Sequence, residues 1–170
     1  MAGYSRPASA RAPARRAVHN DQMAQIGLSI VIGAPVATVW ARVSDLASQT
    51  EWMRDAVAIR FVSAATSGRG TIMDCDTKVG PFRLTDRLVV TEWEDGRSIA
   101  IRHDGAVTGT GRFTLADAGG NSTRFDWTED LTFPWWMGGP AGAAAARPVL
   151  AWTWRRNLAA LRELIESSRR

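Results

Sequence analysis

The stretch "IGLSIVIGAPVATVWARV", residues 26–43, contains an abrupt change in the spacing of its apolar side chains. In its first half every second residue is large and apolar, which is the period of a β-strand with one buried face. These residues are Ile26, Leu28, Ile30 and Ile32. After Pro35, which can begin a helix without losing a hydrogen bond, the spacing becomes i, i+3, i+4, i+7. The stretch therefore predicts a strand that leads directly into an amphipathic helix carrying Val36, Val39, Trp40 and Val43.

A second short helix is predicted next, because Asp45 is a good N-cap and Leu46 and Trp52 supply an apolar side. After it the chain returns to alternation. Short turns such as Gly80-Pro81 separate the alternating segments, as in an antiparallel meander. The predicted strands cover residues 57–61, 71–79, 82–93, 98–103, 112–115 and 122–133.

The last predicted element is a long C-terminal helix. A stripe of apolar residues at helical spacing consists of Leu150, Trp154, Leu158, Leu161 and Ile165. Pro148 is predicted to lie in the first turn of this helix, with the preceding alanines forming a separate short turn or a kinked lead-in. A single sheet with one apolar face needs a cover, and this helix is the long element left to provide it. The fold class is therefore α+β: about six to seven curved antiparallel strands around one helix, with space between them.

Composition and charge suit one soluble domain. The chain has 170 residues, of which 45% are hydrophobic and 22% are charged. Residues 1–22 are predicted to be a disordered basic tail rich in Ala, Pro and Arg, and residues 23–170 a single domain. Setting aside the four arginines of residues 1–20, 17 basic residues remain against 17 acidic ones. A neutral domain argues against binding nucleic acid, and the absence of a long apolar run argues against integral membrane association. The lone Cys75 fits a reducing compartment, so a cytoplasmic protein is expected.

Three phrases together resemble the START-like (SRPBCC) superfamily, and within it the branch of polyketide cyclase/dehydrase and lipid-transport proteins. They are "IGAPVATVWARVSDLASQTEWM", "DRLVVTEWEDGRSIAIRHDG" and "GTGRFTLADAGGNSTRFDWTEDLTFP". The resemblance runs from about residue 26 to residue 166. It implies a helix-grip fold with a deep apolar cavity between sheet and C-terminal helix. It also implies a lipid, sterol, polyketide or other hydrophobic small molecule as ligand, and no common metal or organic cofactor. It supplies no universal catalytic set.

Three polar residues interrupt apolar strand faces and are the candidates for chemistry. Glu129 shares a face with Phe125, Trp127, Leu131 and Phe133. A carboxylate there must be paired, be protonated, or lie beside a polar ligand or water; a structural ion pair is the alternative. Asp86 interrupts the row of Leu84 and Leu88. His103 continues another apolar row but precedes a turn, where a solvated histidine is expected. If these three converge in one cavity, they would supply a general acid and base.

Two histidines in the chain argue against a His-rich metal site. "GTGRF" at 109–113 leads into a strand, so it lacks the context of a phosphate loop, and Arg54-Asp55 reads as a solvated turn.

"FPWWMGGPAG", residues 133–142, joins the last strand to the C-terminal helix. Trp135, Trp136 and Met137 are predicted to form an apolar lip of the cavity, followed by a flexible glycine pair. Adjacent side chains of an extended segment point to opposite sides. One tryptophan is therefore expected to be buried under the helix, at a cost of about 3–5 kcal/mol on removal, and the other to lie near solvent.

Three functions remain open from the sequence. The first is a carrier or sequestering protein for a hydrophobic molecule, with predicted ligand contacts at Phe125, Trp127, Leu131, Phe133, Trp135, Trp136, Met137 and Trp154. The second is an aromatase/cyclase or dehydratase that uses Glu129, His103 and Asp86. The third is a protein-interaction domain. The sequence leaves the oligomeric state undetermined.

Overall fold

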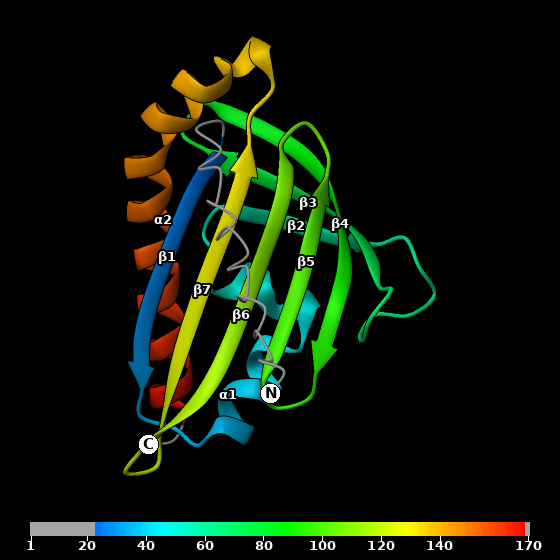
Figure 1. The fold of residues 1–170 in the computed structure, drawn as a ribbon. Helices are drawn as coiled ribbons and strands as arrows, with labels where there is room; N and C mark the ends of the chain where they lie inside the picture. Colours follow the sequence, from blue (N-terminus) through cyan, green and yellow to red (C-terminus); the bar gives the residue numbers. More distant parts are fainter. Residues whose placement is uncertain (1–22, 169–170) are drawn as a thin grey trace, which may run out of the picture.

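The computed structural model describes residues 23–168, so the predicted tail at 1–22 lies outside the described residues. Seven antiparallel strands form one sheet in the order β1-β7-β6-β5-β4-β3-β2. They are β1 (Met23–Ile32), β2 (Ala56–Phe61), β3 (Ile72–Val79), β4 (Phe82–Glu94), β5 (Ser98–Asp104), β6 (Thr108–Gly119) and β7 (Ser122–Thr132). Figure 1 shows the sheet curving around the space that the long C-terminal helix covers. The predicted α+β helix-grip architecture is confirmed, although β6 is much longer than the segment 112–115 expected from alternation.

The change of period after β1 produces the predicted strand-to-helix junction. Helix α1 (Val36–Val43) begins after Pro35, and its Val39 and Val43 are buried. The second short helix is a 3-10 helix, η1 (Leu46–Glu51), and the Asp45 carboxylate accepts a hydrogen bond from the Ser48 backbone N–H at 3.4 Å. These two helices close one end of the curved sheet beneath β5 and β6 (Figure 1).

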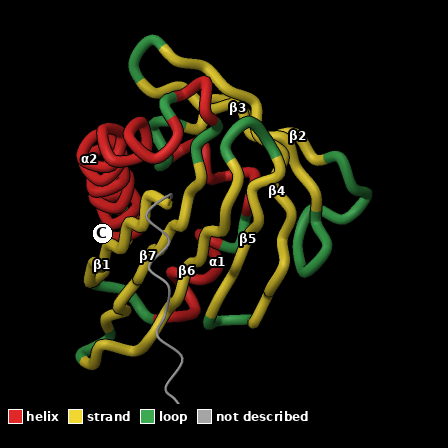
Figure 2. The backbone as a smooth tube through the Cα atoms, turned by 45° about the horizontal axis from the view of Figure 1, so that its top comes forward, coloured by secondary structure: helices red, strands yellow, loops and turns green. Residues whose placement is uncertain are grey.

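The C-terminal helix α2 (Gly139–Ser167) begins nine residues before Pro148, so the predicted start at this proline is wrong. A proline inside a helix removes one backbone donor and bends the axis. Figures 1 and 2 show the first turns of α2 leaning over the end of the sheet, while the remainder descends beside β1. The predicted stripe is buried from Trp154 to Ile165, whereas Leu150 is half-buried.

The core beneath α2 is built largely from aromatic rings. Trp127 of β7 stacks on Trp154 of α2 at 5.1 Å between ring centroids, and Phe113 of β6 meets Trp127 edge-on at 5.2 Å. Phe125 is fully buried and packs against Phe113. A second core cluster fills the space between η1 and strands β2 to β5. Two apolar clusters thus fill part of the concave side of the sheet, and the space between them is where a binding site can lie.

Candidate functional site

A cavity of about 760 Å³ lies inside the curve of the sheet, closed by η1, by α2 and by the 3-10 helix η2 (Trp135–Met137). Its volume falls within the range of about 300–1,000 Å³ that is usual for small-molecule sites. Most of its wall is apolar, with contributions from Met53, Met73, Leu84, Leu88, Ile99, Ile101, Val107, Phe113 and Leu131. The polar groups in this wall are few, which makes the position of each informative.

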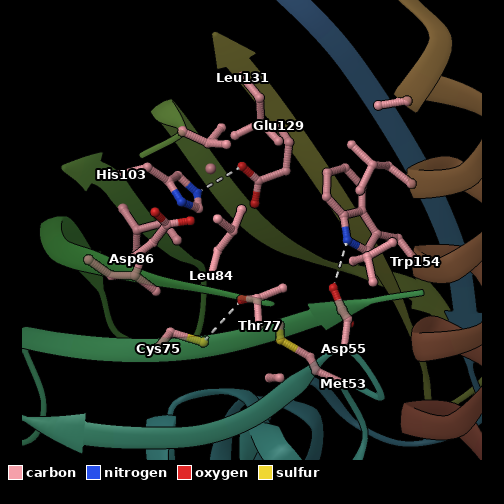
Figure 3. Close-up of a pocket in the computed structure, with 18 of the residues that line it drawn as sticks. Met53, Asp55, Cys75, Thr77, Leu84, Asp86, His103, Glu129, Leu131 and Trp154 are labelled. Carbon is pink, nitrogen blue, oxygen red and sulfur yellow. Dashed lines mark hydrogen bonds and ion pairs between the residues drawn. The ribbon is translucent and has the colours of Figure 1, made fainter. Parts of the chain in front are cut away.

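Glu129 and His103 form a hydrogen-bonded pair in the cavity wall. The Glu129 side chain is almost completely buried, and its Oε2 lies 3.2 Å from His103 Nε2. Its other oxygen, Oε1, accepts a hydrogen bond from the indole N–H of Trp127 at 2.9 Å. The His103 side chain is 16% exposed, so the expectation of a solvated histidine is wrong. The two residues come from β5 and β7, and they meet across the intervening strand β6 (Figure 3).

Glycine in β6 makes this contact across the strand possible. Gly109 is the register partner of His103 on one side, and Gly111 is the partner of Glu129 on the other. A Cβ atom at Gly111 would lie 2.3 Å from Glu129 Oε1, closer than any non-bonded contact allows. The glycine-rich "GTGRF" therefore lies within a strand and leaves the gap that the Glu129 carboxylate occupies.

Asp86 lines the same cavity, next to His103 (Figure 3). It is 8% exposed, and its Oδ1 accepts a hydrogen bond from the Ala106 backbone N–H at 2.9 Å. Within the described residues its other oxygen has no hydrogen-bond partner. The structure thus brings all three residues suggested by interrupted strand faces to one cavity wall.

A second polar group, around Asp55, was missed by sequence reasoning. Asp55 lines the cavity rather than forming a solvated turn. Its carboxylate accepts hydrogen bonds from Asn157 Nδ2 at 2.6 Å and from the Trp154 indole N–H at 3.3 Å (Figure 3). Asn157 is fully buried, and its side-chain oxygen accepts the Arg54 backbone N–H at 3.0 Å. The sequence does contain a signal for this group, because Asn157 interrupts the apolar stripe of α2 in the same way that Glu129 interrupts the apolar face of β7.

Cys75 and Thr77 add a small polar edge on β3. The Cys75 sulfur lies 3.8 Å from the Thr77 hydroxyl oxygen. Burial in apolar surroundings is the main reason why the pKa of the Cys75 thiol is raised above its usual value. The thiol therefore stays protonated at neutral pH, which suits a packing residue better than a nucleophile.

The predicted aromatic lip is present, but neither tryptophan is buried. Trp135 is 87% exposed and does not line the cavity; Trp136 is 58% exposed and does, together with Met137. The prediction that one ring is core is wrong because the segment forms a 3-10 turn, in which successive side chains point about 120° apart rather than to opposite sides. Neither ring therefore supplies the stability of a buried aromatic side chain.

Six of the eight predicted ligand contacts line the cavity: Trp127, Leu131, Phe133, Trp136, Met137 and Trp154. The two that do not are Trp135, which faces solvent, and Phe125, which is a core residue. Phe125 shares the apolar face of β7 but lies beyond the cavity, where Phe113 covers it. Position on the apolar face of β7 therefore did not guarantee a place in the site.

Residues 23–166 match the protein family described as polyketide cyclase / dehydrase and lipid transport. The chain belongs to this family. The match covers nearly all of the described residues, including every strand and the cavity wall. Comparison with curated protein sequences gives no significant match.

Solved structures share the fold of this family member at low sequence identity. An aromatase/cyclase, ZhuI, from a Streptomyces species superposes with a TM-score of 0.66 at 18% identity, over 87% of this chain and 96% of its own. A START superfamily protein from Mycobacterium smegmatis gives 0.71 at 16% identity, over 84% and 97%. A protein from Thermus thermophilus gives 0.70 at 17% identity, over 85% and 98%. These likenesses establish the fold.

Residues 23–168 hold neither a cluster of metal ligands nor a membrane-spanning helix. No three His, Cys, Asp or Glu side chains in this range are grouped so that they could hold a metal ion. No helix in the same range is both long enough and apolar enough to cross a membrane.

Proposed function

We propose that this protein binds a hydrophobic small molecule, such as a lipid or a polyketide-like or other aromatic compound, and carries or sequesters it. The observation that supports this function best is the cavity itself. It combines a volume of about 760 Å³ with a largely apolar wall and a few polar groups that converge on the interior. Apolar sites with few, well-placed polar groups are typical of small-molecule binding. The lone Cys75 supports a cytoplasmic location.

The ligand is proposed to enter between η2 and the β3–β4 turn. Trp136 on one side and Phe82 on the other both line the cavity while remaining 58% and 67% exposed. A large apolar side chain that is partly in solvent and partly in a cavity marks an opening. Gly138, which ends η2 with a φ of 90°, is the point at which this lip joins α2.

Titration with N-phenyl-1-naphthylamine, an uncharged fluorescent probe, tests this proposal on the full chain. We expect saturable binding at one site, with a change in tryptophan emission because Trp127 and Trp154 line the cavity. Leu84→Trp, which adds a ring to the half-buried cavity wall, should weaken binding. Val31→Trp, an equal addition at a 53% exposed position of β1, should not. Binding that does not saturate, or that both variants leave unchanged, would contradict the proposal.

The His103–Glu129 pair favours proton transfer as a second candidate function. A carboxylate and an imidazole within hydrogen-bond reach can act as base and acid, and both face the cavity. Among the structures of the same fold is one described as an aromatase/cyclase. The second function is therefore that of an aromatase/cyclase or dehydratase acting on a polyketide-like substrate, with Glu129 and His103 as catalytic residues and Asp86 beside them.

Glu129→Gln separates the two functions. The amide oxygen can still accept the Trp127 N–H, but the residue no longer exchanges a proton. For an enzyme we expect turnover to fall about 10²–10⁴-fold with the fold intact. For a carrier the same change alters only affinity or selectivity. Glu163→Gln, on the exposed side of α2, is the matched control. A Glu129→Gln protein that does not fold would indicate that the pair is structural.

A further inference from the structure

The cavity wall offers many more hydrogen-bond acceptors than free donors. Three of its residues are carboxylates: Asp55, Asp86 and Glu129. The indole N–H groups of Trp154 and Trp127, which also line the cavity, are already donated to Asp55 and Glu129. A carboxylate can accept about four hydrogen bonds, so each of these three groups has acceptor capacity left for a ligand.

No unpaired cation balances these carboxylates among the described lining residues. The two lining side chains that can carry a positive charge are Arg112 and His103. Arg112 forms a two-fold ion pair with Glu92, with N–O distances of 2.7 and 2.5 Å. His103 uses Nε2 to bind Glu129. Each potential cation is thus committed to a glutamate.

Asp86 is held so that one oxygen must face the cavity. Its Oδ1 accepts the Ala106 N–H at 2.9 Å, and the residue is only 8% exposed. The backbone at Gly105 approaches so closely that a Cβ atom there would lie 1.9 Å from this oxygen. Oδ2 has no hydrogen-bond partner in residues 23–168, and it is not fully enclosed by protein, so it is accessible from the cavity. A donor brought by a ligand would satisfy it.

Gln49 adds an uncommitted polar group to the cavity wall. It lies in η1, is 6% exposed and lines the cavity. Its side-chain amide makes no hydrogen bond to any residue that the structure describes. Its amide atoms are not fully enclosed and face the cavity, so they are free to hydrogen-bond to a ligand. A ligand that fills the cavity would contact it.

We infer that the ligand of this cavity bears hydrogen-bond donors, as hydroxyl or protonated amine groups, and that carboxylates such as free fatty acids are excluded. This inference rests on the proposed function and narrows it to a ligand class. A carboxylate would meet Asp55, Asp86 and Glu129 without an unpaired cation to offset the repulsion. A hydroxyl or ammonium group would instead donate to the free oxygen of Asp86.

Calorimetric titration of the full chain with four naphthalenes tests the inference. The compounds share one ring system and differ in a single group: 2-methylnaphthalene, 2-naphthylmethanol, 2-naphthylmethylamine and 2-naphthoate. We expect the alcohol and the amine to bind at least about tenfold more tightly than 2-naphthoate at pH 8, a ratio that corresponds to one strong hydrogen bond. Binding of 2-naphthoate at least as tight as that of 2-naphthylmethanol would overturn the inference while leaving the proposed function standing. Failure of all four compounds, 2-methylnaphthalene included, would remove both.

Asp86→Asn replaces the unpaired carboxylate oxygen, an acceptor, by an NH₂ group, a donor, in a side chain of nearly the same shape. The asparagine oxygen can still accept the Ala106 N–H, while its NH₂ group faces the cavity as a donor. We expect the preference for 2-naphthylmethanol over 2-naphthoate to fall at least about fivefold, through tighter binding of the acid, since a like charge is removed. Asp117→Asn is the matched control, because Asp117 also accepts a backbone N–H, from Gly119 at 2.9 Å, but is exposed at the far hairpin. An unchanged preference in Asp86→Asn would overturn the assignment of Asp86. If that variant does not fold, the titration of the wild-type protein with the four naphthalenes still tests the inference about the ligand class.

Discussion

Replacing Trp127 with alanine is expected to lower the free energy of unfolding by about 3–5 kcal/mol, the usual cost of removing a large buried ring. Trp127 is 4% exposed and contacts Trp52, Phe113 and Trp154 through its ring. Its ring joins β7 to α2, to β6 and to Trp52 at the end of η1, so its loss empties the centre of the aromatic core. Urea denaturation followed by circular dichroism measures the effect.

Trp127→Phe divides this loss into its packing and hydrogen-bonding parts. Phenylalanine keeps a ring in the same place but cannot donate to Glu129 Oε1, which now accepts the indole N–H at 2.9 Å. A buried acceptor left without a donor costs about 1–3 kcal/mol. We therefore expect the phenylalanine variant to lie between wild type and alanine. Equal stabilities of the phenylalanine variant and wild type would mean that the Trp127–Glu129 hydrogen bond contributes little.

Gly111→Ala is expected to displace the Glu129 carboxylate and to break its contact with His103. The new Cβ would lie 2.3 Å from Glu129 Oε1 and 2.7 Å from its carboxyl carbon, so the side chain has to move. Overpacking of this kind costs about 1–3 kcal/mol in stability. Because the polar wall of the cavity is rearranged, affinity for 2-naphthylmethanol should fall about tenfold, equivalent to roughly 1.4 kcal/mol. Denaturation and calorimetric titration provide the two measurements.

Gly27→Ala is the control for this substitution. Gly27 lies in β1 of the same sheet, and the nearest atom to a Cβ there is Thr128 Cγ2 at 3.9 Å, an ordinary contact. Alanine in that strand should leave binding unchanged and hold or slightly raise stability, since it restricts the unfolded chain. If both alanine variants behave alike, the gap at Gly111 is not what positions Glu129.

The fold was predictable because its main signals are local. The change of period at Pro35 and the alternation of β7 each depend on neighbouring residues, and both features are present as predicted. The start of α2 was mispredicted because proline is typical of the first turn of a helix. In the structure the alanines before Pro148 are already helical, so the helix begins at Gly139 and continues through the proline. The packing of α2 against β1 tolerates this interruption, and sequence periodicity carries no information about such tertiary support.

The site was less predictable because it depends on distance through space. Glu129 could be singled out from its strand face, but its contact with His103 depends on a glycine in a third strand. Asp55 was predicted to lie in a solvated turn, because its partner Asn157 lies 102 residues further along the chain. The prediction that one tryptophan of the lip is buried was wrong for a different reason. The segment is a three-residue 3-10 helix rather than extended, and both rings are exposed.

Because β1 pairs with β7, it has no neighbouring strand until β7 (Ser122–Thr132), about 90 residues further along the chain, has been made. Strands β2 to β6 pair with their sequence neighbours and can assemble as successive hairpins during synthesis. The β1–β7 ladder is a long-range closure, and contacts of large sequence separation form slowly. Helix α2, which covers the interior, follows all seven of these strands in the chain. A small molecule that binds in this cavity therefore stabilises the assembled domain rather than its early hairpins.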